Sequence, residues 1–160
     1  MAILNPSAQC PCTSGKTYKA CCKPLHDGLL IANSAEQLMC SRYSAFVANN
    51  VSYLIATLHP NRREADDEIV LKQTMAKTQW LGLKIIQHKP NGHTATVEFV
   101  AFYQDGSETG QLHEKSNFIY ESDQWFYRDG EILTAIKLSR NELCFCGSGK
   151  KVKKCHTRLV

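Results

Sequence analysis

The sequence predicts an α+β protein with a small cysteine-rich segment at each end. In the first half, apolar residues recur at helical spacing, and in the second half they alternate with polar residues as in strands. Thirteen residues, 10–22, recur almost position for position at 144–156 without a gap. We therefore expect three units. They are an N-terminal segment over 1–27, a central domain over 28–138 and a C-terminal segment over 139–160. The central domain carries the continuous apolar pattern, so we expect it to fold without either end.

Three helices are expected in the first half of the central domain. Ser34 can cap the first helix, with Gln37 three residues later completing a capping box. The second helix, over about 51–58, ends before Pro60, which cannot continue it. The third helix, over about 66–78, begins with acidic residues, which are favourable at a helix N-terminus.

After the third helix, the period of the apolar residues changes to two, which indicates strands. Apolar residues alternate over 81–85 and again over 97–103, and a Pro-Asn-Gly turn at 90–92 separates the two runs. Asp105-Gly106 and Gly110 are expected to form a loop, and further strands are expected over 112–120 and 125–128. Helices followed by such an antiparallel meander are typical of the α+β class.

The two repeated segments contain two sets of four candidate metal ligands. Each set has two cysteines separated by one residue, then a Ser-Gly-Lys reversal, then two adjacent ligands. Zinc prefers a tetrahedron of Cys and His ligands, and a metal tolerates the exchange of Cys for His that a disulfide cannot. The sets are Cys10, Cys12, Cys21 and Cys22, and Cys144, Cys146, Cys155 and His156.

A disulfide framework is the alternative interpretation of these cysteines. Seven cysteines within the two segments cannot all pair, and Met1 opens no apolar-cored signal peptide. The longest apolar runs are also too short to span a membrane. We therefore predict a cytoplasmic protein that holds two structural zinc ions, each with four protein ligands and no open position for water.

The run 139–156 resembles the SEC-C motif, the zinc module at the C-terminus of the SecA translocation motor. The resemblance implies a docking role for this segment, like that of the SecA module toward a chaperone and other partners. The N-terminal copy is similar, with Thr13 where the motif usually has glycine. A copy at each end, together with the runs 38–46 and 125–130, is similar to the YchJ-like bacterial family. That resemblance implies a cone-shaped, nuclear-transport-factor-2-like central domain of three helices against a bent sheet.

The charges of the chain are concentrated at its ends. Residues 1–24 carry a formal charge of +3 and residues 140–160 carry +5, whereas the middle carries −4. Thiolates bound to zinc would offset much of this lysine excess. The basic ends are therefore weak evidence for nucleic-acid binding.

A cone of this kind is expected to have an open mouth and a pocket. Glu114 and Ser116 share one face of a strand with an apolar neighbour, so the carboxylate should point inward. A buried carboxylate needs a partner, and Arg42 or His59 could provide one. Glu114 would then be either a satisfied internal ion pair or a general base or ligand anchor. His113 is predicted to be exposed on the opposite face. The candidate pocket residues are Arg42, Tyr43, Tyr53, His59, Glu114 and Ser116.

Three classes of function remain open. The first is a module that docks onto a protein or an acidic assembly such as the ribosome or a chaperone, and we favour it because rigid zinc segments suit docking. The second is an enzyme or small-molecule binder that uses the cone, and the third is direct nucleic-acid binding. The Gly-Ser-Gly run at 147–149 has no strand-to-helix context, and no other catalytic motif is present, which favours a non-enzymatic role. The candidate docking residues are Lys150, Lys151, Lys153 and Lys154.

Overall fold

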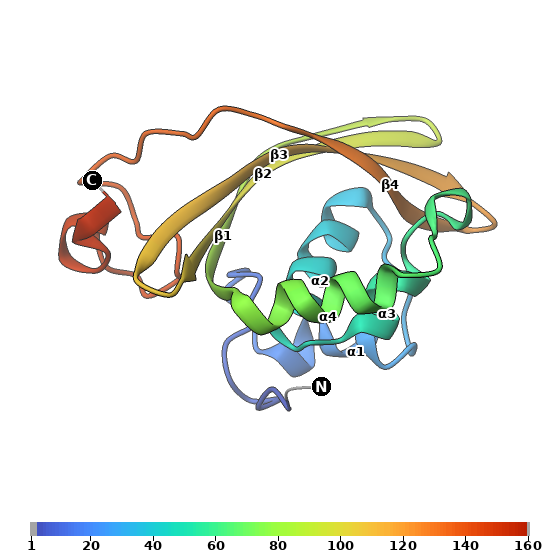
Figure 1. Cartoon of the computed structure of the whole chain (residues 1–160), viewed down its shortest axis with the longest axis horizontal. Helices are drawn as coiled ribbons and strands as arrows, with labels where there is room; N and C mark the ends of the chain where they lie inside the picture. The colour runs from blue at the N-terminus through green and yellow to red at the C-terminus, as the bar shows by residue number, and fades with distance from the viewer. Residues whose placement is uncertain (1–2, 160) are drawn as a thin grey trace.

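The computed structural model describes residues 3–159 and shows a curved antiparallel sheet arched over a layer of helices (Figure 1). Each of four strands pairs with the next, so the sheet is a meander in the order β1-β2-β3-β4. This arrangement confirms the predicted α+β class. The strands are β1 (Gln79–Asn91), β2 (Thr94–Asp105), β3 (Glu108–Glu121) and β4 (Gln124–Ile132).

The helices lie under the concave face of the sheet (Figure 1). Three of them match the predicted helices, and the sequence patterns missed a further, four-residue helix, α1. Within residues 3–159, no helix is both long and apolar enough to cross a bilayer. The α-helices are α1 (Lys23–His26), α2 (Ala35–Val47), α3 (Val51–Ala56) and α4 (Asp67–Lys77). Short 3-10 turns are formed by Tyr18–Ala20, Pro60–Arg62, Val152–Lys154 and Thr157–Leu159.

Side chains cap the starts of α2 and α3. Ser34 Oγ accepts a hydrogen bond from the Gln37 N–H at 3.1 Å, as the sequence predicts. The Gln37 side chain in turn accepts a hydrogen bond from the N–H of Asn33, one residue before the N-cap. Asn50 Oδ1 caps α3 through the Tyr53 N–H at 3.2 Å. These caps fix where the helices begin beneath the sheet.

Two turns of the sheet differ from the prediction. Pro90 is part of β1 and pairs with Ala95, so the turn is centred on Gly92, whose φ is +61°. The strand tolerates this proline because β1 is an edge strand. Gly110, which we expected in a loop, lies in β3 opposite Tyr103. A Cβ at Gly110 would lie 2.7 Å from the Tyr103 ring, so packing explains this glycine.

Strand β2 is buried on both faces. Its inward residues, Val97, Phe99 and Ala101, pack against the helices, as the two-residue period predicts. Its outward residues Val100 and Phe102 are 0% and 1% exposed, because the C-terminal segment covers them. The alternation alone did not predict this second burial.

The prediction that His113 is exposed is wrong. His113 lies on the outer face, but the chain that follows β4 runs across it, and only 9% of its surface is exposed. Leu133 N–H donates to the backbone oxygen of His113 at 2.8 Å, and His113 Nδ1 lies 2.6 Å from the oxygen of Thr134. The other ring nitrogen, Nε2, lies 2.8 Å from the Glu98 carboxylate. His113 thus fastens the segment after β4 to the sheet.

This histidine predicts a pH dependence of stability. Burial acts to lower the pKa of His113, but the hydrogen bonds to Thr134 and Glu98 outweigh it and raise the pKa above its ordinary value. Its stabilising contribution is therefore fully present below the unfolded-state pKa of about 6.5, and it is lost as pH rises through the folded-state pKa. We expect His113→Gln to lower the free energy of unfolding more at pH 6 than at pH 8. Urea unfolding of both proteins at both pH values measures this difference, and an equal loss at the two would contradict it.

Candidate metal centres and cone cavity

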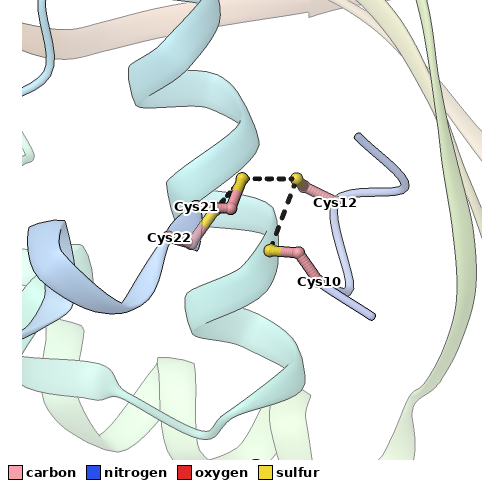
Figure 2. A group of neighbouring side chains, drawn as sticks. All are labelled: Cys10, Cys12, Cys21 and Cys22. Atoms are coloured by element: carbon pink, nitrogen blue, oxygen red, sulfur yellow. Dashed lines mark hydrogen bonds between the residues drawn. The ribbon is translucent and has the colours of Figure 1, made fainter. Parts of the chain in front are cut away.

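The four thiols of the N-terminal segment converge beside helix α2 (Figure 2). Cys10 and Cys12 come from one turn, and Cys21 and Cys22 lie directly before α1. Neighbouring Sγ atoms are 3.5 Å apart for Cys10 and Cys12, 3.6 Å for Cys12 and Cys21, and 3.8 Å for Cys21 and Cys22. A tetrahedron with metal–sulfur bonds of about 2.3 Å has edges of about 3.8 Å. The cluster could therefore hold one metal ion.

The turn that carries Cys10 and Cys12 explains the departure from glycine at Thr13. Cys10 N–H donates to the oxygen of Lys16, and Thr13 N–H donates to that of Cys10. Thr13 has a φ of +61°, a conformation that normally favours glycine. Its hydroxyl lies 2.7 Å from the oxygen of Cys12 and 2.9 Å from that of Leu83 on β1. These hydrogen bonds offset the strain and tie the turn to the sheet edge.

The C-terminal segment repeats this architecture. Cys144 N–H donates to the oxygen of Lys150 at 2.8 Å, which matches the bond from Cys10 to Lys16 in the first copy. The Sγ atoms of Cys146 and Cys155 are 3.5 Å apart, and His156 Nδ1 lies 3.1 Å from the sulfur of Cys144. All four donor atoms lie within 4.8 Å of one another. This second cluster could also hold a metal ion.

A serine contacts each cluster, although the sequence pattern indicates it only as part of the Ser-Gly-Lys reversal. Ser14 Oγ lies 3.2 Å from the sulfur of Cys21, and Ser148 Oγ lies 3.3 Å from that of Cys155. The two serines occupy equivalent positions of the repeat. The presence of Ser-Gly-Lys in both copies of the repeat could have identified these serines from the sequence.

The crowded thiols of each cluster shift one another's pKa. Hydrogen bonds with Cys10 and Cys22 lower the pKa of Cys12 far below its ordinary value, whereas the Cys12 contact raises the pKa of Cys10 to about 11. In the second cluster, burial raises the pKa of Cys144 to about 12. Burial also opposes ionisation of Cys146, but hydrogen bonds with Ser148 and the neighbouring thiols lower its pKa. A bound cation would displace the remaining protons.

The N-terminal segment is part of the core of the protein. Cys10 and Cys22 are 2% and 1% exposed and pack in one buried cluster with residues of α2 and of the sheet. The sulfur of Cys10 lies 3.7 Å from Ser44 Oγ on α2. The ring of His26 lies between the Tyr18 hydroxyl and the backbone oxygen of residue 41, at 2.7 and 2.8 Å. Metal ligands and core residues are thus interleaved here.

The C-terminal segment packs instead on the outer face of the sheet. The ring of Phe145 stacks on that of Phe102, with centroids 3.8 Å apart and planes 13° apart. A Cβ at Gly82 would lie 2.3 Å from the oxygen of Phe145, so only glycine fits below the segment. Figure 1 shows this segment at one end of the sheet, away from the helices.

A cavity of about 330 Å³ lies between the sheet and helices α2, α3 and α4. Four of the six candidate pocket residues line it: Arg42, Tyr43, Glu114 and Ser116. Tyr53 lines a different cavity of about 340 Å³ beside α1, and its hydroxyl lies 2.7 Å from Ser41 Oγ. His59 lies outside the first cavity and contacts Glu121 at 2.6 Å. The structure therefore brings together only part of the predicted pocket.

Glu114 points inward, but the ion pair that we expected with Arg42 or His59 is not formed among residues 3–159. Two hydroxyl groups donate to one oxygen of its carboxylate instead. Ser116 Oγ donates to Glu114 Oε1 at 2.7 Å, and the Tyr127 hydroxyl donates to the same oxygen at 3.0 Å. Tyr127 belongs to β4, so the partner depends on strand pairing that the sequence pattern did not reveal.

The fold and the two clusters define a class of protein, a cone-shaped α+β domain with a SEC-C metal-binding motif at each end. The family model described as the YchJ middle NTF2-like domain matches residues 34–130, and the SEC-C motif model matches 7–24 and 140–158. A curated UPF0225 protein of Serratia proteamaculans is 42% identical over 151 residues, which cover 91% of this chain and 96% of that protein. The chain belongs to this family, the UPF0225 proteins with a YchJ middle domain.

Solved structures of two SEC-C motif containing proteins are similar to this one. A SEC-C motif containing protein from Rhodopseudomonas palustris, solved in solution, is 35% identical with a TM-score of 0.74, and the match covers 78% of this chain and 98% of that one. A crystal structure of a SEC-C motif containing protein from Psychrobacter arcticus is 30% identical with a TM-score of 0.67. That match covers 97% of this chain and 99% of the other. The resemblance to the family that the sequence suggested is therefore confirmed.

Proposed function

We propose that this protein is a zinc-stabilised docking module whose C-terminal segment binds an acidic protein surface. One observation carries the proposal: the C-terminal segment has an apolar side and a basic side. Phe145 and Val152, 6% and 0% exposed, face the sheet and anchor the segment. Its four candidate docking lysines lie on the solvent side, three of them exposed and Lys153 half-buried.

The proposal names zinc because of the donor types. The first cluster offers four thiolates and the second offers three thiolates and one imidazole, and such donors suit Zn²⁺ and are poor ligands for Mg²⁺ or Ca²⁺. Four protein donors fill a tetrahedron, so each ion would be structural and would leave no position for a reacting water. Zinc would hold the short segment rigid, and its lysine stems would then lose little entropy on contact with a partner.

We expect the protein, purified without chelator, to contain about two zinc ions per chain. Cys155→Ser removes one donor from a single cluster and should leave about one ion. Cys40→Ser is the matched control, because Cys40 lies outside both four-donor sets. Elemental analysis by mass spectrometry measures the content. One ion or none in the unaltered protein, or a loss in the Cys40 variant equal to that in the Cys155 variant, would contradict the assignment.

The charge on the basic side supports docking to a protein or an acidic assembly such as the ribosome or a chaperone. Residues 143–160 contain no acidic side chain, and Glu142 is already paired with Lys84 at 2.7 Å. Within the part of the chain that the structure describes, no ion pair joins these lysines to a carboxylate, so the metal-bound thiolates would be their main compensation. That compensation favours a moderately acidic protein surface over the dense charge of nucleic acid. Such attraction should raise the association rate and weaken with salt.

Changing Lys150, Lys151, Lys153 and Lys154 to Glu should abolish capture of the partner, because the attraction becomes repulsion. The measurement is the set of proteins that co-purify from lysate at low and high salt. The matched control changes four exposed lysines of the central domain and its flank to Glu, which alters the net charge equally: Lys77, Lys89, Lys115 and Lys137.

Both variants should keep about two zinc ions per chain, which shows that the segments remain folded. An unchanged set of co-purifying proteins in the first variant would refute docking through this segment. Loss of capture after nuclease treatment of the lysate, when the captured material contains no ribosomal proteins, would show that the target is nucleic acid and would equally refute the proposal.

A further inference from the structure

We propose that the cone cavity binds a small carboxylic acid with a flat apolar body, whose carboxylate contacts Arg42 and the indole N–H of Trp80. This inference is independent of docking, because it concerns the other side of the sheet from the C-terminal segment. The family and motif matches assign no ligand to this cavity.

The walls of the cavity suit an apolar, planar body. Its volume of about 330 Å³ lies at the lower end of the range for small-molecule sites, about 300–1,000 Å³. Aromatic rings from both layers face it, and aliphatic side chains of α3 and α4 complete it. The aromatic residues are Tyr43, Phe46, Trp80, Phe99 and Tyr127. Val70 on α4 is half exposed and lines the same cavity, which indicates that the cavity reaches the surface along this helix.

Arg42 supplies a buried cation to this cavity. Its Nη1 donates to the oxygen of Leu54 at 2.8 Å and to Thr57 Oγ1 at 2.6 Å, and the guanidinium carbon lies 4.7 Å from the centroid of the Tyr127 ring. Burial lowers the pKa of Arg42 to about 10, so it remains charged at neutral pH. Among residues 3–159 no carboxylate forms an ion pair with it. A buried charge of this kind is costly unless an opposite charge joins it.

Trp80 lines the same cavity and carries an unused hydrogen-bond donor. Its Nε1 is buried and has no hydrogen-bond partner in the part of the chain that the structure describes. The ring is fixed among the rings of Tyr43, Phe46 and Tyr103, whose centroids lie 5.8–6.0 Å from its own. Buried donors without a partner are rare in native proteins. An acceptor oxygen of a ligand would satisfy this one.

Glu114 supplies the acceptor in the cavity, and one of its two carboxylate oxygens is already engaged. Glu114 Oε1 accepts hydrogen bonds from Ser116 and Tyr127, both inside the cavity wall. The cavity therefore has donors to spare in Arg42 and Trp80, and an acceptor in Glu114 that is partly occupied. A carboxylate matches this balance, whereas an ammonium group would face the guanidinium.

Two probes of the same shape and opposite charge test the inference: 2-naphthoate and 2-naphthylmethylammonium. Binding is followed through the indole N–H resonances in a ¹H–¹⁵N NMR spectrum. The chain has two tryptophans, and Trp125 lines the other cavity, so it serves as an internal control. Naphthoate should shift the Trp80 resonance and not that of Trp125, and it should bind at least about tenfold more tightly than the cation.

Variants separate the roles of the two charges. Arg42→Gln should weaken naphthoate binding about tenfold or more, whereas Glu114→Gln should leave it unchanged or strengthen it. Arg42 also donates hydrogen bonds to Leu54 and Thr57, so its replacement could disturb the fold as well as ligand binding. Ala101→Phe therefore tests the cavity by a second, independent change. Ala101 is 2% exposed and lines the cavity, so a phenyl ring there fills the cavity and should abolish binding with Arg42 intact.

Three results would overturn the inference. The first is absence of naphthoate binding, or tighter binding of the ammonium probe. The second is a shift of Trp125 in place of Trp80. The third is full binding by the Ala101→Phe protein. Each of them would show that the cavity is only a packing defect of the cone or that it selects a different chemistry.

Discussion

Replacing Cys22 with Ala is expected to destabilise the whole protein, whereas Cys155→Ala should loosen only the C-terminal segment. Cys22 is 1% exposed, and its cluster shares a buried core with Leu38 of α2 and Leu83 of β1. Loss of the first metal site should therefore remove support from the helical layer and lower the free energy of unfolding by more than about 4 kcal/mol. Cys155 is half-buried in a segment that rests on the outer face of the sheet.

Thermal unfolding followed by circular dichroism, together with hydrogen exchange, measures both effects. In Cys155→Ala, fast exchange should be confined to the C-terminal segment, and in Cys22→Ala it should extend through α1 and α2. Cys40→Ala is the matched control, because it removes a thiol beside the first cluster that is not among its four donors. Equal and local effects of Cys22→Ala and Cys155→Ala would contradict this asymmetry.

That expectation refines the view from the sequence, in which residues 28–138 fold without either metal segment. That the central domain folds without the C-terminal segment stays a prediction. On the N-terminal side, the contacts of Thr13 with Leu83 and of Cys10 with Ser44 join the first metal cluster to the sheet and to α2. Chelation should then act in two steps, with the C-terminal segment loosening before the core is lost.

Local patterns in the sequence predicted the features that depend on local geometry. The repeated ligand spacing identified both clusters, because ligands two and nine residues apart meet through tight turns. Ser34 marked the start of α2 because a hydroxyl at that position satisfies a free N–H. The two-residue period assigned Glu114 and His113 to opposite faces, since side chains alternate along a strand.

The sequence patterns did not predict features that depend on contacts distant in the chain. His113 is buried because the residues after β4 run back across the outer face of the sheet. The sequence around position 113 contains no pattern that predicts this contact. Glu114 finds its partner in Tyr127 because β4 pairs with β3 and places Tyr127 opposite Phe118, on the same face as Glu114. Periodicity specifies which face a residue occupies, whereas pairing and docking specify what covers it.

Replacing Gly82 with Val is expected to release the C-terminal segment from the sheet while its metal ligands stay complete. A Cβ at position 82 would lie 2.3 Å from the oxygen of Phe145 and 2.8 Å from its Cδ2, so backbone as well as side chain would have to move. Displacement would separate the stacked rings of Phe145 and Phe102 and expose Val100. The loss of docking should be comparable to a buried Phe→Ala change, about 3–5 kcal/mol.

Hydrogen exchange over 139–159 and limited proteolysis measure the release, and elemental analysis should still find about two zinc ions. Phe102→Ala should cause the same release from the other side of the contact. Gln87→Val is the control, because it places a β-branched residue at an exposed position of the same strand. Unchanged protection of 139–159 in Gly82→Val would show that Phe145 does not anchor the segment.

The Gly82→Val variant also tests whether docking depends on the fixed positions of the lysines or only on their charge. The released segment would keep its four lysines and its metal ligands, so a partner that binds through charge alone should still be captured. A partner that requires the lysines at fixed positions above the sheet should be lost, because the entropy of ordering a mobile segment would then oppose binding. We expect loss, since Lys84 and Gly82 on β1 hold Glu142 and Phe145 in one orientation next to the lysine cluster.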